Sequence, residues 1–95
     1  MILKELDPLL HSELRLAIMS VLLSVAEADF TYLQDICNAT AGNLSAQLDK
    51  LQKANYIVIK KEFVGKRPRT VCSMTQQGQI AFKQYIEDIK IYLHL

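Results

Sequence analysis

Apolar side chains recur every three or four residues near the start of the chain, which is the spacing of one face of a helix. Between about residues 11 and 26 this stripe consists of Leu14, Ala17, Ile18, Val21, Leu22 and Val25. Ser12 is placed to cap the segment, and the pattern predicts the central core helix. Residues 1–10 have a similar spacing that Pro8 interrupts, which predicts a short helix or arm packing on the body or on a partner subunit.

Two shorter helices, joined by about three residues, are predicted in the middle of the chain. The first covers 31–37, with Thr31 as its N-cap, after a short extended segment that begins at Phe30. Its inward-facing residues are Leu33, Ile36 and Cys37. The second covers about 41–54, with Thr40 as its N-cap, and its apolar seam consists of Leu44, Leu48 and Leu51. Two short helices in this order, the second with a polar outer face, predict a helix-turn-helix.

The pattern changes to that of strands after Asn55, a residue type that tolerates the left-handed conformation at helix ends. Residues 56–63 alternate and are rich in β-branched side chains, and 69–74 form a second strand. Between them, 64–68 is predicted to be a turn in which Gly65 permits positive φ. The result is a two-stranded hairpin with a basic tip, and it must lie on the helices because so short a hairpin is only marginally stable alone.

A last helix is predicted from about residue 76 to about residue 93, with Thr75 as its N-cap. Its apolar seam is too long and too aromatic for a small monomer to bury completely. We therefore interpret the seam as a dimer surface, with packing in the core of the chain as the alternative. The residues assigned to the dimer interface, two of them from the N-terminal arm, are Leu3, Leu6, Phe82, Tyr85, Ile86, Ile89, Tyr92 and Leu93.

Taken together, these elements predict a mainly α fold with a small β-hairpin (α+β), in the order of a winged helix-turn-helix. Dimerisation helices are expected at both ends. We expect a single DNA-binding domain over 1–95. Its parts would be an N-terminal helix or arm at 1–10, a winged-helix core at 11–75 and a C-terminal dimerisation helix at 76–95.

The composition is that of a globular protein, because 51% of the residues are hydrophobic and 22% are charged. No apolar run approaches the roughly 20 residues that cross a membrane, and the amino terminus lacks a signal-peptide pattern, so we expect a cytoplasmic protein without a membrane partner. Cys37 and Cys72 are expected to be free thiols with structural roles. No Cys and His cluster has metal-ligand spacing, and no phosphate loop or set of nucleophile, base and acid is visible. We therefore expect no metal, no cofactor and no enzyme.

Positive charge is concentrated in one segment, although the net charge of the chain is only +1. Residues 50–69 contain seven bases and one acid, whereas the other residues contain four bases and nine acids. The segment therefore carries +6 and the remainder −5. Such an asymmetry is expected of a protein that meets a polyanion through one surface.

Three stretches carry a family resemblance: LDPLLHSELRLAIMSVL (6–22), ADFTYLQDICNATAGNLSAQLDKLQKANYI (28–57) and KKEFVGKRPRTVCSMTQQGQIAF (60–82). Their most specific positions are Gly42, Asn43, Leu44 and Ser45 with Leu48, Leu51 and Tyr56, and then the run 65–70 with Met74, Thr75 and Gly78. In these stretches the chain resembles small prokaryotic winged helix-turn-helix transcriptional regulators of the broad MarR/ArsR type. The resemblance implies a homodimer that binds operator DNA, with the terminal helices in the dimer contact.

The function we expect is that of a sequence-specific regulator of transcription that binds double-stranded DNA, namely a homodimeric repressor. A recognition helix at about 41–54 would enter the major groove, and a basic wing at 57–74 would contact the backbone or the minor groove. The residues assigned to DNA contact are Thr31, Thr40, Asn43, Ser45, Ala46, Gln47, Lys50, Lys53, Lys60, Lys61, Lys66, Arg67 and Arg69. The alternative is a winged-helix module that binds a protein and not nucleic acid.

Two features of some relatives are not found in the sequence. Metal-sensing members of the ArsR group carry paired cysteines near the recognition helix, whereas Cys37 stands alone, so metal sensing is not favoured. Larger MarR proteins add helices that enclose an effector pocket, for which 95 residues leave little room. A small-molecule effector therefore has no support in the sequence.

Overall fold

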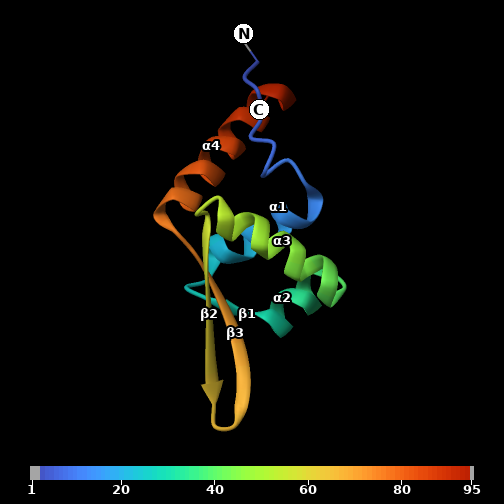
Figure 1. Cartoon of the computed structure of the whole chain (residues 1–95). Helices are drawn as coiled ribbons and strands as arrows, with labels where there is room; N and C mark the ends of the chain where they lie inside the picture. Colours follow the sequence, from blue (N-terminus) through green and yellow to red (C-terminus); the bar gives the residue numbers. More distant parts are fainter. Residues whose placement is uncertain (1–2, 95) are drawn as a thin grey trace.

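The computed structural model describes residues 3–94, so residues 1 and 2 of the expected N-terminal arm and Leu95 lie outside the described part. The elements follow in the order α1 (Glu13–Ser24), β1 (Ala28–Asp29), α2 (Phe30–Cys37), α3 (Ala41–Lys53), β2 (Ile57–Val64), β3 (Arg67–Met74) and α4 (Gln76–Leu93). Figure 1 shows the helices around one end of a long hairpin of β2 and β3, whose tip extends away from them. The predicted α+β class, mainly helical with a small hairpin, is confirmed.

Three helices begin at the caps that the sequence predicts. The hydroxyl caps of α1, α3 and α4 are Ser12, Thr40 and Thr75. In each case the side-chain oxygen accepts a hydrogen bond from the backbone N–H three residues further on, which satisfies one of the unpaired donors of the first turn. These starts depend on residues that are close together in the sequence, so local pattern was sufficient to predict them.

The start of α2 was predicted wrongly. Its N-cap is Asp29, whose Oδ1 accepts from the backbone N–H of Tyr32 at 2.8 Å, whereas Thr31 lies inside the helix. Phe30 is the first helical residue and not the start of an extended segment. The reason is β1, which pairs Ala28 and Asp29 with the distant strand β3 and so sets the point at which the chain turns into the helix.

Only one side chain of α2 is fully buried. Leu33 lies in the core, but Ile36 is 54% exposed, so its predicted inward orientation is wrong, and Cys37 is half-buried. The helix is too short to present a longer stripe, because Asn38 adopts the left-handed conformation (φ 51°) and ends it. Asn55 adopts the same conformation (φ 64°) just after α3, as its residue type predicts.

One hydrophobic core joins the helices to the base of the sheet. Its largest fully buried side chains are Leu10, Ile18, Met19, Leu33, Leu44, Leu48, Leu51, Ile57 and Cys72. The seam of α3 is thus buried as predicted, at about 1.5–3 kcal/mol of burial free energy for each large apolar side chain. On α1, Ile18 and Leu22 of the predicted stripe are buried, whereas Leu14, Ala17 and Val21 are half-buried. Val25 is an exception: it is the extended C-cap residue of α1, and it is exposed.

The sheet has three antiparallel strands in the order β1-β3-β2, where the sequence predicted two. Val64 pairs with Arg67, so the turn consists of only Gly65 and Lys66, and the predicted five-residue turn is wrong. Gly65 has φ 65° at the first central position, which is the arrangement of a type II′ hairpin turn. This turn matches the twist of the strands, and pairing therefore continues to the tip, with Pro68 inside β3.

The N-terminal segment is an arm and not a helix: residues 3–7 form neither helix nor strand, and a turn follows at 8–10. Tyrosine hydroxyls hold the arm. Tyr92 donates to the carbonyl of Lys4, and Tyr56 donates to Asp7 Oδ2, both at 2.6 Å. Burial, with the hydrogen bond and the charge of Asp7, raises the pKa of Tyr56 to about 12.

The seam of α4 is divided between the core and the surface. Phe82 and Tyr85 are only 4% and 5% exposed within the single chain, so core packing accounts for them and their assignment to a dimer surface does not fit. The reason is that both side chains belong to the hydrophobic core of the single chain, where Tyr85 also contacts His11 Nδ1 through its hydroxyl at 2.8 Å. Tyr92 and Leu93, near the end of the helix, remain exposed.

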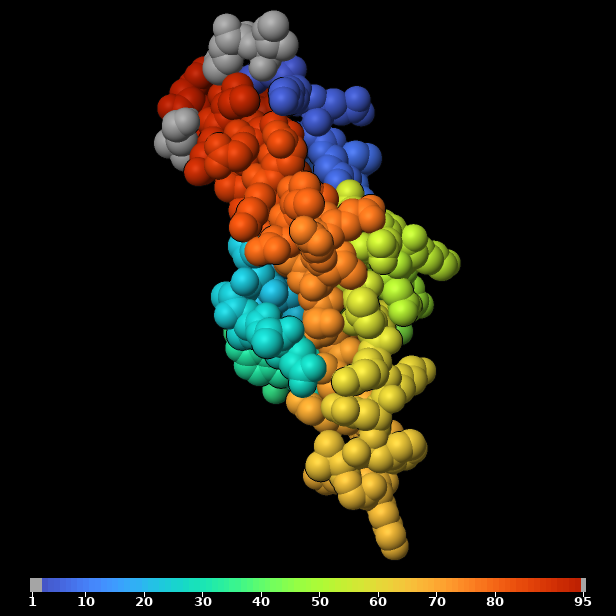
Figure 2. Space-filling model, turned by 90° about the vertical axis from the view of Figure 1, so that its left-hand side faces the viewer, coloured from blue at the N-terminus to red at the C-terminus, as the bar shows by residue number. Residues whose placement is uncertain are grey.

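The molecule is elongated, with extents of 55 × 25 × 21 Å. In the space-filling view of Figure 2 the hairpin tip forms one end of the long axis, and the end of α4, with the N-terminal arm beside it, forms the other. Within residues 3–94, no helix is both long enough and apolar enough to span a bilayer.

Candidate nucleic-acid interface

The side of α3 opposite its buried leucines is open to solvent. We call it the outer face of α3, and its exposed residues are Gly42, Asn43, Ser45, Ala46, Asp49, Lys50 and Lys53. The first two turns carry only small or amide side chains, which let another molecule approach the backbone closely. Both lysines lie in the last turn. Of the residues that the sequence assigned to the recognition helix, only Gln47 is half-buried.

Residues that face each other across an antiparallel pair project to the same side, and successive residues project to opposite sides. The helix-facing side of the hairpin therefore carries Ile57, Ile59, Lys61 and Phe63 with their partners Met74, Cys72, Thr70 and Pro68. The far side carries Val58, Lys60, Glu62 and Val64 with Ser73, Val71, Arg69 and Arg67. The neighbouring lysines Lys60 and Lys61 consequently project in opposite directions, although the sequence analysis assigned both to DNA contact without distinguishing them.

The outer face of α3 borders the helix-facing side of the hairpin. Ser45 and Asp49 from α3 line one hollow of about 170 Å³ together with Lys61 and Thr70 from the two strands. The recognition helix and one basic residue of the wing thus share a continuous surface. Asp49 is the only acid among the described residues that line this hollow, and no ion pair joins Asp49 to Lys53 in residues 3–94.

A second hollow, of about 680 Å³, lies on the far side of the hairpin. Thr31 of α2 and Arg67 of β3 line it, beside Asp29 and Arg69. Thr31 and Arg67, which are exposed, are therefore brought together, but on the other side of the hairpin from Lys61. Lys66 occupies the exposed turn at the tip.

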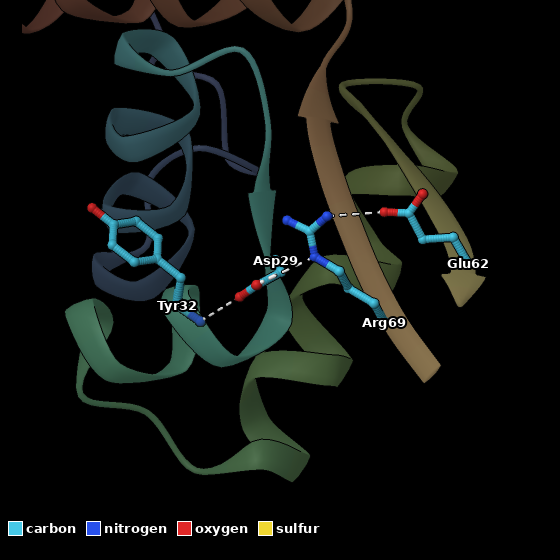
Figure 3. A network of polar contacts seen from close by, with 4 residues as sticks. All are labelled: Asp29, Tyr32, Glu62 and Arg69. Carbon is cyan, nitrogen blue, oxygen red and sulfur yellow. Dashed lines mark hydrogen bonds and ion pairs between the residues drawn. The ribbon is translucent and has the colours of Figure 1, made fainter. Parts of the chain in front are cut away.

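Arg69 is held by two carboxylates, as Figure 3 shows. Its Nη1 lies 3.0 Å from Glu62 Oε1 of β2, and its Nε lies 3.5 Å from Oδ2 of Asp29, the same residue that caps α2. A guanidinium between two carboxylates is already neutralised. The expected phosphate contact of Arg69 therefore does not fit, and its position indicates that it ties the hairpin to the body.

Gln47 is also engaged within the protein, by a residue that the sequence reading missed. The Nη1 of Arg15, on α1, donates to Gln47 Oε1, and Gln47 Nε2 donates to Asn43 Oδ1 at 3.0 Å. The Nε of Arg15 donates to the carbonyl of Leu9. An arginine between two leucines of α1, Leu14 and Leu16, was the signal that could have pointed to this contact, but its partner lies 32 residues away.

Phe63 is a second residue that was not singled out. It is 73% exposed, on the helix-facing side of the hairpin beside Pro68, because the strands extend beyond the helices that cover their base. The alternating pattern predicts a strand but not where its cover ends. An exposed aromatic ring three residues before Lys66 is an apolar contact point near the tip of the wing.

Neither cysteine is a reactive thiolate at neutral pH. Burial raises the pKa of the Cys72 thiol to about 11, and it also raises the pKa of Cys37. Cys72 is fully buried at the base of the sheet, which accords with a structural role. In the described part of the chain, His, Cys, Asp and Glu side chains do not gather into a group of three that could hold a metal ion.

Comparison with families of known proteins gives a match over most of the chain. A family model described as a winged helix DNA-binding domain matches residues 14–93. An uncharacterized protein of Methanocaldococcus jannaschii is 34% identical over 79 residues, which are 83% of this chain and 86% of that protein. The resemblance to winged helix-turn-helix regulators that the sequence shows is thereby confirmed.

Solved structures share the fold. A transcriptional regulator homologue from Pyrococcus horikoshii OT3 superposes with a TM-score of 0.84 at 29% identity, and the match covers 90% of this chain and 85% of that one. A mutant of MarR from E. coli, crystallised with operator DNA, gives a TM-score of 0.72 at 17% identity, covering 88% of this chain and 58% of that one. At this lower identity the match concerns the fold alone.

Proposed function

The chain belongs to the family of winged helix DNA-binding domains, and from this we propose that it is a transcriptional regulator that binds operator DNA as a homodimer and represses transcription. The similar structures from Pyrococcus horikoshii and E. coli, a regulator homologue and a regulator bound to operator DNA, support a DNA partner. Repression would follow most simply from occupying a promoter that polymerase needs.

The observation that carries the proposal is the surface shared by α3 and the hairpin. Small and amide side chains on the first turns of α3 can approach base edges in the major groove, where Asn can both donate and accept. Lys61 borders the same surface, and Lys66 lies beyond it at the tip. A polar helix face that continues into a basic hairpin is the arrangement that a DNA duplex requires.

We assign the contacts accordingly. Asn43, Ser45 and Ala46 would lie nearest the bases, and Lys50 and Lys53 would reach phosphates beside the groove. The hydroxyl of Thr40 accepts the cap hydrogen bond, so its proton is free to donate to a phosphate. Lys61 and Lys66 would neutralise the backbone next to the wing. Residues on the far side of the hairpin, which are Thr31, Lys60 and Arg67, would contact the backbone only if the duplex bends around the wing.

The end of α4 is our candidate for the dimer interface. Leu93 and Tyr92 are exposed there, and Ile86 and Ile89 are half-buried. The arm, whose Lys4 carbonyl accepts a hydrogen bond from Tyr92, carries Leu3 and Leu6. This end lies opposite the hairpin tip, so a dimer formed through it leaves both recognition helices free. The half-sites would then lie about 34 Å apart, or a multiple of that distance.

Selection of bound duplexes from a random-sequence pool tests the proposal. A dimeric regulator should enrich a two-fold symmetric site, and its affinity for that site should fall with log[salt] at a slope of nearly one for each phosphate neutralised. Failure to enrich any sequence, together with an affinity that does not respond to salt, would favour the alternative, a winged-helix module that binds protein. An enriched site without symmetry would contradict the dimer.

A further inference from the structure

A chain of hydrogen bonds runs from the N-terminal arm to the first turn of α3. It begins at the carbonyl of Leu9, which accepts from Nε of Arg15, and it continues from Nη1 of Arg15 to Oε1 of Gln47. It ends where Nε2 of Gln47 donates to Oδ1 of Asn43 at 3.0 Å. This series of hydrogen bonds thus ends on Asn43, an exposed residue at the third position of the recognition helix.

The direction of this chain follows from chemistry and not from an arbitrary choice of amide rotation. A guanidinium can donate but cannot accept, so the atom of Gln47 that faces Arg15 must be the oxygen. The NH₂ group of Gln47 then faces Asn43, and the atom of Asn43 that receives it must be the oxygen. The NH₂ group of Asn43 is then turned away from Gln47, and within residues 3–94 no hydrogen bond engages it.

We propose that Arg15 determines the base preference of the recognition helix, by acting through Gln47 to make Asn43 present hydrogen-bond donors to the DNA. The inference rests on the proposed function, because it requires α3 to lie in a major groove. Arg15 is a positioning residue here and need not touch DNA itself. It is well placed for this, since its own orientation is held by the carbonyl of Leu9, beside the fully buried Leu10.

The chemical consequence concerns which base Asn43 selects. The familiar bidentate pair with adenine needs the amide oxygen and the amide nitrogen side by side at the base edge, but Gln47 holds the oxygen of Asn43 toward itself through one of its two lone pairs. An amide whose NH₂ group faces the bases matches the two major-groove acceptors of guanine, N7 and O6, and it fits worst to cytosine, whose edge offers a donor. The half-site is therefore expected to contain guanine at the position that Asn43 contacts.

Gln47→Glu tests the inference because it reverses the chain. A carboxylate still accepts from Arg15 but cannot donate to Asn43, so the amide of Asn43 rotates to donate to it and turns its own oxygen outward. We expect the preference of guanine over cytosine at that position, measured with the selected duplex and its three single-base variants at one salt concentration, to shrink about tenfold or to invert.

Gln52→Glu is the matched control, since it adds the same charge to an exposed glutamine of the same helix that takes no part in the hydrogen bonds from Arg15 to Asn43. It is expected to weaken all four duplexes alike and to leave the ratio between bases unchanged. A change of ratio that Gln52→Glu reproduces would overturn the inference, as would an unchanged ratio in Gln47→Glu.

Arg15 itself is tested by two variants. Arg15→Lys keeps a group that can only donate and is expected to retain the preference for guanine, whereas Arg15→Ala frees Gln47 to rotate and is expected to lower the ratio about fivefold or more. Equal base ratios in the wild type and in Arg15→Ala would overturn the inference, since a purely structural role of Arg15 would change overall affinity and not preference.

A measurement without DNA separates this inference from the proposed function. In the free protein, the side-chain NH₂ resonances of Gln47 and Asn43 should shift in Arg15→Ala and remain close to wild type in Arg15→Lys. Unmoved resonances would overturn the inference even where the protein binds its operator. A protein that selects no duplex, but shows the expected resonance shifts, would instead contradict the proposed function and with it the assignment of base preference.

Discussion

Gly78 of α4 lies directly against the backbone of Tyr56, so that a Cβ on Gly78 would be 2.1 Å from the Tyr56 carbonyl oxygen. The backbone N–H of Thr75 donates to that same oxygen at 3.0 Å, and the Thr75 hydroxyl donates to the carbonyl of Asn55 at 2.7 Å. The first turn of α4 is therefore locked to the link between α3 and β2. This crossing sets the direction in which α4 leaves the winged core.

Gly78→Ala is expected to destabilise the protein by about 1–3 kcal/mol, because backbone atoms cannot move aside for the added methyl group as a flexible side chain would. Chemical unfolding in urea measures the change. Gly42→Ala is the matched control: it is also a helical glycine, but nothing lies within 4 Å of its added Cβ, and it should be neutral or stabilising by up to about 1 kcal/mol. Equal effects of the two substitutions would contradict the close crossing.

Lys60→Ala and Lys61→Ala should differ in their effect on DNA binding, although the residues are adjacent. Lys61 borders the outer face of α3, so its loss is expected to weaken binding to every duplex and to reduce the salt slope by about one. Lys60 projects from the far side of the hairpin, and its loss should change the slope much less. Titrations at several salt concentrations give both slopes, and the reverse order would place the DNA on the far side.

Arg69→Ala is expected to leave the salt slope of DNA binding unchanged, because the guanidinium is already paired with Asp29 and Glu62. Its cost in stability should be small, at most about 1 kcal/mol, since about a third of each ionic side chain is exposed and solvent screens the pair. Asp29→Ala should cost about 1 kcal/mol more, because it also removes the cap of α2. A salt slope that falls by about one in Arg69→Ala would show that Arg69 contacts phosphate after all.

The free energy of unfolding should fall as the pH rises above about 9. Burial raises the pKa of Cys72 from its ordinary value of 9.0 to about 11, so the unfolded chain loses the thiol proton at a lower pH than the folded one does. The stability that the neutral, buried thiol contributes to the folded state is fully present below pH 9 and is lost as the pH rises to about 11.

Unfolding of Cys72→Ala across this range is the direct check, and its stability should depend less on pH between 9 and 11 than that of the wild type. Tyr56→Phe serves for comparison. The pKa of Tyr56 is raised from 10.0 to about 12, so this substitution should change the pH dependence of stability between about pH 10 and 12. Parallel curves for the wild type and Cys72→Ala would exclude the thiol as the cause.

Leu93→Glu is expected to produce a monomer, because Leu93 is 59% exposed at the end of α4 that we assign to the dimer. A buried charge at such an interface would weaken association strongly. Sedimentation at micromolar concentration should show the change, with a matching loss of operator affinity. Ile36→Glu is the control, since this residue of α2 is exposed to a similar degree at a different site, and the variant should remain dimeric.

The elements of this protein were largely determined by patterns within a few residues. The caps Ser12, Thr40 and Thr75 and the leucine seam of α3 were predicted because a capping hydroxyl and an apolar face interact with residues three or four positions away. The winged order of helices and hairpin followed from these elements. The concentration of positive charge between residues 50 and 69 indicated a polyanionic partner.

Contacts between distant residues were decided only by the tertiary structure. The pairing of β1 with β3 made Asp29 the cap of α2, and the register of β2 with β3 sent Lys60 and Lys61 to opposite sides. The length of the hairpin left Phe63 exposed. A sequence shows which side chains are charged or polar, but whether such a group faces solvent or a partner 32 residues away, as Arg15 faces Gln47, depends on how the helices pack.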